Sequence, residues 1–238
     1  MPNLELENVS KTYETGNQRV EALRSVSITT DAGDFVAVMG PSGCGKSTLL
    51  HLIGGMDRPT GGTITLAGRD LTSLTDDELA RTRRTEIGFV FQFFNLLPTL
   101  TVIENVALPL TLDGCREREA RERARRMLDR VGLGARETHR PAQLSGGEMQ
   151  RAAVARAVIC EPKIVLADEP TGNLDTENGE HVLTLIEDIN RELGVTVILA
   201  THSVEAARSA MRVIRLRDGV LEQIIEHEAG QNPVLPAV

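Results

Sequence analysis

The chain has 238 residues, of which 41% are hydrophobic and 25% are charged, and its formal net charge is −8. This composition is ordinary for a folded globular domain, and the acidic balance disfavours nucleic acid as a partner because a phosphate backbone attracts basic surfaces. The sequence contains no run near the roughly 20 apolar residues of a membrane-spanning helix, and its first residues are unlike a signal peptide. The three cysteines form neither a disulfide framework nor a metal-ligand spacing, which favours free thiols in a reducing compartment.

The first hundred residues contain two kinds of strand pattern. Apolar and polar residues that alternate predict half-buried antiparallel strands, whereas short continuous apolar runs predict strands buried on both faces. In chain order, the alternating segments are 4–6, 26–28 and 63–66, and the buried runs are 35–39 and 87–91. A helix is expected from residue 47, directly after a glycine-rich loop.

The pattern becomes helical from residue 101 to about 131. Thr101 and Glu104 have the spacing of a capping box, and apolar residues recur on one face of the segment that follows. Opposite charges four residues apart, such as Glu117 and Arg121, predict a solvated helix face rather than a nucleic-acid site. Buried strand runs return at 164–167 and 195–199 with helical stretches between and after them, which indicates a mostly parallel sheet.

The glycine-rich loop matches the phosphate-binding pattern G-x-x-x-x-G-K-S, with a strand before it and a helix after it. Glycines let backbone amides approach phosphate oxygens, a lysine supplies a positive charge to them, and the serine hydroxyl can bind Mg²⁺. The helix that follows presents its positive end to the anion. The predicted nucleotide-binding residues of this loop are Gly40, Pro41, Ser42, Gly43, Cys44, Gly45, Lys46, Ser47 and Thr48.

Two adjacent carboxylates follow the buried run 164–167. Asp168 fits a residue that holds Mg²⁺ through water, and Glu169 fits a general base that polarises the attacking water. Two acidic residues at a strand end are equally compatible with a solvated turn. The presence of Lys46 in the phosphate loop favours the functional interpretation.

A third motif, Leu-Ser-Gly-Gly-Glu-Met-Gln-Arg, occupies residues 144–151. Ser145 and Glu148 have capping-box spacing, and a helix start with two glycines is also an anion site, so the two interpretations are compatible. Joined to the phosphate loop and the paired carboxylates, this motif resembles the signature of the ATP-binding-cassette (ABC) ATPases. The resemblance covers about residues 1–225.

The resemblance implies roles for residues that carry no signal alone. It places Gln92 in the family's Q-loop, as a catalytic residue and as a ligand of Mg²⁺ with Ser47 and Asp168. It also makes His202 the switch histidine, a catalytic residue together with Glu169. Ser203 follows His202 where the family often has aspartate. The residues expected at adenine are Tyr13 and Val20, those of the D-loop are Asn173, Leu174 and Asp175, and those of the signature are Leu144, Ser145, Gly146, Gly147, Glu148 and Gln150.

The family also implies partners and cofactors. Two cassettes face each other head to tail, so the signature of one chain acts on the ATP of the other, and ATP and Mg²⁺ are the expected cofactors. Because the chain has one set of motifs, a second copy of itself is the expected partner. Separate membrane permease subunits are expected to dock near Gln92 and the helical lobe, which places the chain in the cytoplasm on the inner face of the cell membrane.

Segments 55–62 and 167–175 resemble the subgroup of lipoprotein-releasing, macrolide-exporting and cell-division cassettes. The expected function is therefore an ATPase that powers export, lipoprotein extraction or mechanical signalling. Two alternatives remain open, the ATPase of a solute importer and a soluble ABC ATPase such as an iron–sulfur assembly factor. Copurification of membrane subunits or of soluble assembly proteins would distinguish the alternatives.

The predicted fold class is α/β. It comprises a P-loop NTPase core with a mostly parallel sheet, an antiparallel N-terminal β lobe and an inserted helical lobe within one ABC ATPase domain. The core is expected at about 3–95 and 157–225, the helical lobe at about 96–156, and a loosely ordered tail at about 227–238.

Overall fold

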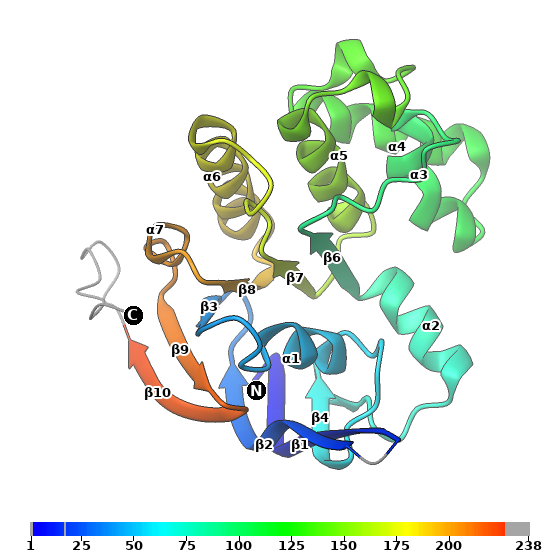
Figure 1. Ribbon diagram of the computed structural model, residues 1–238. Helices are drawn as coiled ribbons and strands as arrows, with labels where there is room; N and C mark the ends of the chain where they lie inside the picture. Colours follow the sequence, from blue (N-terminus) through cyan, green and yellow to red (C-terminus); the bar gives the residue numbers. More distant parts are fainter. Residues whose placement is uncertain (1, 17, 227–238) are drawn as a thin grey trace. The chain divides into compact units, whose positions relative to one another are not determined.

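The computed structural model describes residues 2–16 and 18–226 (Figure 1). The chain divides into two compact units: the first takes in the described residues up to Ala80 and from Thr196 onward, and the second is Arg81–Val195. The predicted tail at 227–238 lies outside the described residues. The lobe boundaries at 96 and 156 stay a prediction.

The first unit contains two groups of strands. In one group the order is β2-β1-β4-β5 and every neighbouring pair is antiparallel, which confirms the antiparallel N-terminal lobe. Its strands are β1 (Leu4–Thr15), β2 (Gln18–Thr30), β4 (Gly61–Leu66) and β5 (Arg69–Asp70). The alternating residues Leu4, Leu6 and Ile28 are buried in it, as expected for strands with one core-facing side.

In the other group of the first unit the order is β10-β9-β3-β8. These strands are β3 (Phe35–Met39), β8 (Thr196–Thr201), β9 (Arg212–Arg217) and β10 (Val220–Glu226). All of β3 and β8 is buried, and β3 pairs in parallel with β8 and β9, in keeping with the continuous apolar runs of the sequence. The helices α1 (Lys46–Ile53) and α7 (Val204–Ala207) follow β3 and β8.

The second unit pairs β6 (Ile87–Phe91) in parallel with β7 (Ile164–Asp168). Its helices are α3 (Val102–Leu112), α4 (Glu117–Arg130), α5 (Gly146–Val158) and α6 (Thr176–Leu193). The helix α5 contacts α3, α4, α6 and β6, so the helix that begins at the signature lies at the centre of this unit. The boundary between the units falls within α2 (Asp76–Thr85).

The two capping boxes form as predicted, at Thr101 for α3 and at Ser145 for α5. The helical segment 101–131 is interrupted, however, because Asp113 ends α3 and Gly114 has φ 87° in the turn before α4. Glu117 and Arg121 form the expected pair at 3.2 Å. None of the helices in the described part of the chain has the length and apolar character needed to cross a membrane.

Candidate active site

The phosphate loop joins β3 to α1, and neighbouring backbone leaves no space for side chains at two of its glycines. A Cβ on Gly45, which has φ 108°, would lie 2.5 Å from the carbonyl oxygen of Ala22, and a Cβ on Gly40 would lie 2.2 Å from that of Leu216. Within the described residues no side chain caps the first turn of α1. The amides of that turn and the positive end of the helix dipole therefore form a site for an anion.

The ammonium of Lys46 lies against this loop. Its Nζ donates to the carbonyl oxygens of Gly40 at 2.7 Å and Pro41 at 3.1 Å, and the residue is only 7% exposed. These two bonds orient the ammonium along the loop. A positive charge is thus held at the loop where phosphate oxygens would bind.

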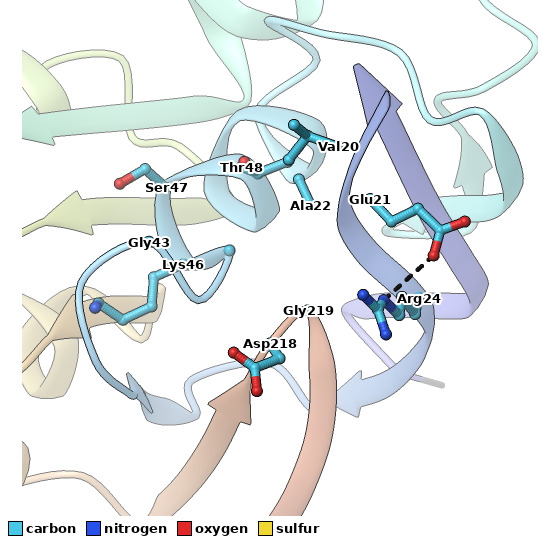
Figure 2. Close-up of a pocket in the computed structure, with 11 residues that line it drawn as sticks. Val20, Glu21, Ala22, Arg24, Gly43, Lys46, Ser47, Thr48, Asp218 and Gly219 are labelled. Carbon is cyan, nitrogen blue, oxygen red and sulfur yellow. Dashed lines mark ion pairs between the residues drawn. The ribbon is translucent and has the colours of Figure 1, made fainter. Parts of the chain in front are cut away.

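A pocket of about 490 Å³ opens over the loop, within the size range of ligand sites. Figure 2 shows the side chains of Lys46 and Ser47 on one side of it and the ion pair of Glu21 with Arg24, at 3.4 Å, on the other. The lining residues are Gly43, Gly45, Lys46, Ser47 and Thr48 from the loop and α1, Val20, Glu21, Ala22 and Arg24 from β2, and Asp218 and Gly219. The structure thus brings Val20 to the same pocket as the phosphate loop.

The turn Asp218–Gly219 was missed by the sequence analysis, which expected helix after residue 199. It joins β9 to β10, and both residues have positive φ, 49° and 77°. The amide of Gly219 donates to the Cys44 carbonyl at 3.0 Å, and its carbonyl accepts from the Arg24 amide at 2.8 Å. The hairpin therefore ties the phosphate loop to β2. An Asp-Gly pair between alternating apolar residues is the signal that could have predicted it.

Tyr13 and Val20 are cross-strand partners on β1 and β2 and are 38% and 57% exposed. The Tyr13 hydroxyl donates to Oδ2 of Asp57 at 2.9 Å, and Nζ of Lys11 lies 2.6 Å from Oδ1 of Asp57 and 4.8 Å from the Tyr13 ring centroid. Burial and the hydrogen bond to Asp57 raise the pKa of Tyr13. The ring is thus anchored at its hydroxyl and covered by a cation, beside a residue that lines the pocket.

His202 is exposed and follows directly after β8. Ser203 caps the short helix α7, accepting from the amide of Ala206 at 3.2 Å, and its own amide donates to the Thr201 hydroxyl at 3.0 Å. The serine that departs from the family pattern therefore fixes the backbone directly after the histidine.

In the second unit β7 ends at Asp168. Among the described residues none donates a hydrogen bond to its buried Oδ1. Glu169, next in the chain, has φ 45°, in the left-handed region that non-glycine residues seldom adopt. The described residues contain no group of three or more histidine, cysteine or acidic side chains placed to hold a metal ion. An unsatisfied carboxylate oxygen nevertheless suits a cation bound through water, as Mg²⁺ often is. The residues present therefore fit Mg²⁺.

Gln92 and Asn173 lie together. The side-chain amide of Asn173 donates to the Gln92 carbonyl at 2.9 Å, and Nε2 of Gln92 lies 3.4 Å from Oδ1 of Asn173. A Cβ on Gly172 would approach Nε2 of Gln92 to 2.8 Å, so glycine makes this contact possible. Asp175 caps α6 by accepting from the amide of Asn178 at 2.9 Å.

The signature motif begins α5. The Ser145 hydroxyl accepts from the Glu148 amide at 3.2 Å, and the Glu148 carboxylate accepts from the Ser145 amide at 2.8 Å and pairs with Arg136 at 3.0 Å. The hydrogen bond from the Ser145 backbone is the main cause that lowers the pKa of Glu148, against its burial. A Cβ on Gly147 would lie 2.2 Å from Oδ1 of Asn178, so a larger residue there would displace the Asn178 side chain.

Two other signature residues face their own chain. Leu144 packs against the hydrophobic core of the second unit. Gln150 is completely buried, and its Nε2 donates to the carbonyl oxygens of Phe91 at 3.2 Å and Pro170 at 2.7 Å. Gln150 is thus bonded to the residue before Gln92 and to the residue after Glu169, two of the expected catalytic residues.

A phosphate loop at the start of α1, with a pocket over it, defines an α/β protein that binds nucleotide phosphates. A family model described as "ABC transporter" matches residues 23–172. The chain belongs to the ABC transporter family of ATP-binding proteins and is an ATPase, as predicted.

Similar proteins agree with this assignment. An uncharacterized ABC transporter ATP-binding protein of Thermotoga maritima is 48% identical over 93% of this chain and 94% of its own length. The macrolide export ATP-binding/permease protein MacB of Syntrophobacter fumaroxidans is 48% identical over 93% of this chain, which spans 31% of that protein. A dimeric post-hydrolysis structure of the ATP-binding cassette MJ0796, bound to ADP and Pi, covers 94% of this chain and 98% of its own, with 44% identity and a TM-score of 0.87. The predicted fold class and the likeness to macrolide-export cassettes are confirmed.

Proposed function

We propose that the chain is the ATP-binding subunit of a membrane complex and powers export, lipoprotein extraction or force transmission through separate permease subunits. The observation that carries the proposal is the pocket at Lys46 in a chain that matches about a third of an ATP-binding/permease protein. The name of that relative joins ATP binding to a permease, and we assign the permease part of this complex to a separate partner. The chain would then lie on the cytoplasmic face of the membrane.

Nucleotide binding is assigned to the first unit. Lys46 and the amides of the phosphate loop would bind the β- and γ-phosphates, with Tyr13 stacked on adenine and Val20 beside it. Ser47, Gln92 and Asp168 would hold Mg²⁺, which would neutralise phosphate charge. The unsatisfied Oδ1 of Asp168 supports its part in this set.

Hydrolysis is assigned to Glu169, which would accept a proton from the attacking water, with His202 and Gln92 orienting the reacting groups. Ser145, Gly146 and Gly147 would contact the ATP of a second copy. The dimeric structures of the similar cassette MJ0796 support a homodimer. ATP would join the two chains, and hydrolysis with product release would let them part, because only a difference in affinity between the two states can drive the cycle.

The membrane partner is expected to dock beside Gln92. Phe93 is 72% exposed and Leu97 44%, so this segment offers apolar side chains to a permease subunit. Pull-down from solubilised membranes would test the assignment. Recovery of an exporter-type, lipoprotein-releasing or force-transmitting membrane protein supports it, whereas recovery of a solute-import complex or of soluble assembly proteins would establish one of the alternative functions.

Glu169→Gln tests the catalytic assignment. We expect ATP to bind normally, hydrolysis to fall by at least about 100-fold, as for loss of a general base, and an ATP-bound dimer to accumulate in size-exclusion chromatography. Glu119→Gln on the exposed face of α4 is the matched control and should hydrolyse ATP at the wild-type rate. Wild-type turnover by Glu169→Gln would show that the base is another residue.

A further inference from the structure

The signature helix α5 holds the backbone on both sides of Gln92. On the side that precedes Gln92, Nε2 of Gln150 donates to the carbonyl oxygen of Phe91. On the side that follows, the guanidinium of Arg156 donates to the carbonyl oxygens of Phe94 at 2.9 Å and Asn95 at 2.5 Å. The short segment that carries Gln92 is therefore fixed to a single helix at both of its ends.

The two carbonyls bound by Arg156 belong to an unusual stretch of backbone. Phe94 and Asn95 have φ of 59° and 50°, and left-handed residues of this kind persist only where surrounding structure holds them. Burial lowers the pKa of Arg156, and its guanidinium presents two donors in a fixed fork that matches two adjacent carbonyls. A lysine would keep the charge but could not reproduce the fork.

Gln150 also reaches the other expected catalytic segment. The same Nε2 donates to the carbonyl oxygen of Pro170, the residue directly after Glu169. No described residue donates to its buried Oε1, so the side chain is held entirely through its donor. A completely buried amide shared between two loops is costly to remove, because the Pro170 carbonyl would lose this donor, although the Phe91 carbonyl would keep its bond from the Phe94 amide at 3.2 Å.

We propose that Gln150 and Arg156 are positioning residues that transmit movement of the signature helix to Gln92 and Glu169 of the same chain. The inference rests on the proposed function, in which the signature acts on the partner's ATP while Gln92 and Glu169 act on the chain's own ATP. Since Ser145 caps α5 and Gln150 and Arg156 lie farther along the same helix, a shift at its start reaches both loops. The links couple the two ATP sites of the dimer.

The chain contains no tryptophan, so Phe93→Trp introduces a single tryptophan next to Gln92, at a position that is 72% exposed, and this residue can be excited without Tyr13. In the Glu169→Gln background, we expect ATP-driven dimerisation to change its emission. Adding Gln150→Met, which keeps the shape and removes the donor, or Arg156→Lys should abolish this change while the dimer still forms. In an otherwise wild-type chain, Gln150→Met and Arg156→Lys should each lower kcat by about 5-fold or more. Each should also bring the Hill coefficient for ATP toward one.

Matched controls are Gln223→Met, an exposed glutamine of β10, and Arg118→Lys on α4, an arginine whose side chain is 92% exposed. The coupling between the signature helix and the two loops is refuted if Gln150→Met and Arg156→Lys show the same emission change, kcat and Hill coefficient as their control variants. This holds even if the melting temperature falls. If Gln150→Met fails to fold, Arg156→Lys decides alone. Failure of Glu169→Gln to trap any dimer would instead refute the proposed function.

Discussion

The anchoring of Tyr13 by Asp57 leads to a quantitative prediction for ATP affinity. Asp57 accepts from the Tyr13 hydroxyl and from Lys11, and Oδ1 of its carboxylate also accepts from the Arg58 amide at 2.7 Å. Burial alone would raise the pKa of Asp57, but the hydrogen bonds from Lys11 and Tyr13 outweigh it and hold the pKa below its usual value. Asp57→Asn keeps the shape of the side chain and removes its charge.

The size of the effect follows from the exposure of the cluster. A hydrogen bond to a charged group contributes about 1.5–3 kcal/mol, but the Asp57 side chain is 33% exposed, and solvent screening reduces this to about 1 kcal/mol. If that loss appears as freedom of the Tyr13 ring, ATP should bind about 5-fold more weakly, since about 1.4 kcal/mol corresponds to a factor of ten. The rate at saturating ATP should not change, because the cluster does not contact the reacting phosphate.

Steady-state ATPase kinetics and direct binding of a fluorescent ATP analogue measure this prediction. Asp76→Asn is the matched control, because Asp76 is 94% exposed and pairs with Arg58 at 2.8 Å. Tyr13→Phe should give a similar loss, and the double variant should lose no more than either single variant, since both remove one interaction. An unchanged KM in Asp57→Asn, or fully additive losses in the double variant, would show that Asp57 does not hold the Tyr13 ring for ATP binding.

Two further predictions concern the phosphate loop and a helix cap. Gly45→Ala should abolish nucleotide binding in a folded chain, because its Cβ would lie 2.5 Å from the Ala22 carbonyl oxygen. Titration with a fluorescent ATP analogue measures binding, and circular dichroism checks the fold. Retained affinity would contradict this loop geometry. Glu104→Gln should lower the melting temperature at pH 7, because hydrogen bonds from the Thr101 amide and hydroxyl hold the pKa of Glu104 below 4.5, its usual value. A carboxyl group whose pKa is lowered in the folded state stabilises the fold above its unfolded pKa of 4.5, and this stabilisation is lost as the pH falls through the folded-state pKa. The difference in melting temperature between Glu104→Gln and wild type should therefore vanish in acid. A difference that stays constant with pH would contradict the role of Glu104.

The elements that the sequence predicts well are those determined by near neighbours. The buried runs at β3, β6 and β7 are strands, and both capping boxes form, because each depends on residues within about four positions. The break at Gly114 and the hairpin turn at Asp218 also have local signals, a glycine after α3 and an Asp-Gly pair. Those two misses were therefore avoidable.

The contacts that shape the candidate site are of another kind. Tyr13 and Asp57 are 44 positions apart, and Gln150 and Phe91 are 59 apart, so no local pattern relates them. Motif spacing identifies which residue types belong to the site, but their partners depend on strand register and on how α5 packs. Gln150 shows the difference, since the motif indicates a partner's nucleotide and the fold buries its side chain against its own chain.

The buried polar atoms without a partner show where the fold leaves bonding capacity unused. Among the described residues these atoms are Oγ1 of Thr30, Nδ1 of His139, Oδ1 of Asp168 and Oε1 of Gln150. Asp168 directly precedes Glu169, and Gln150 donates to the carbonyl of Pro170, which directly follows Glu169. An unsatisfied buried atom costs about 1–3 kcal/mol, so a fold selected for stability alone would pair them. Unsatisfied polar atoms and left-handed backbone both occur preferentially at functional sites, and Glu169 itself has φ 45°. The unsatisfied atoms of Asp168 and Gln150, and the backbone of Glu169, therefore agree with the proposed catalytic role of this segment.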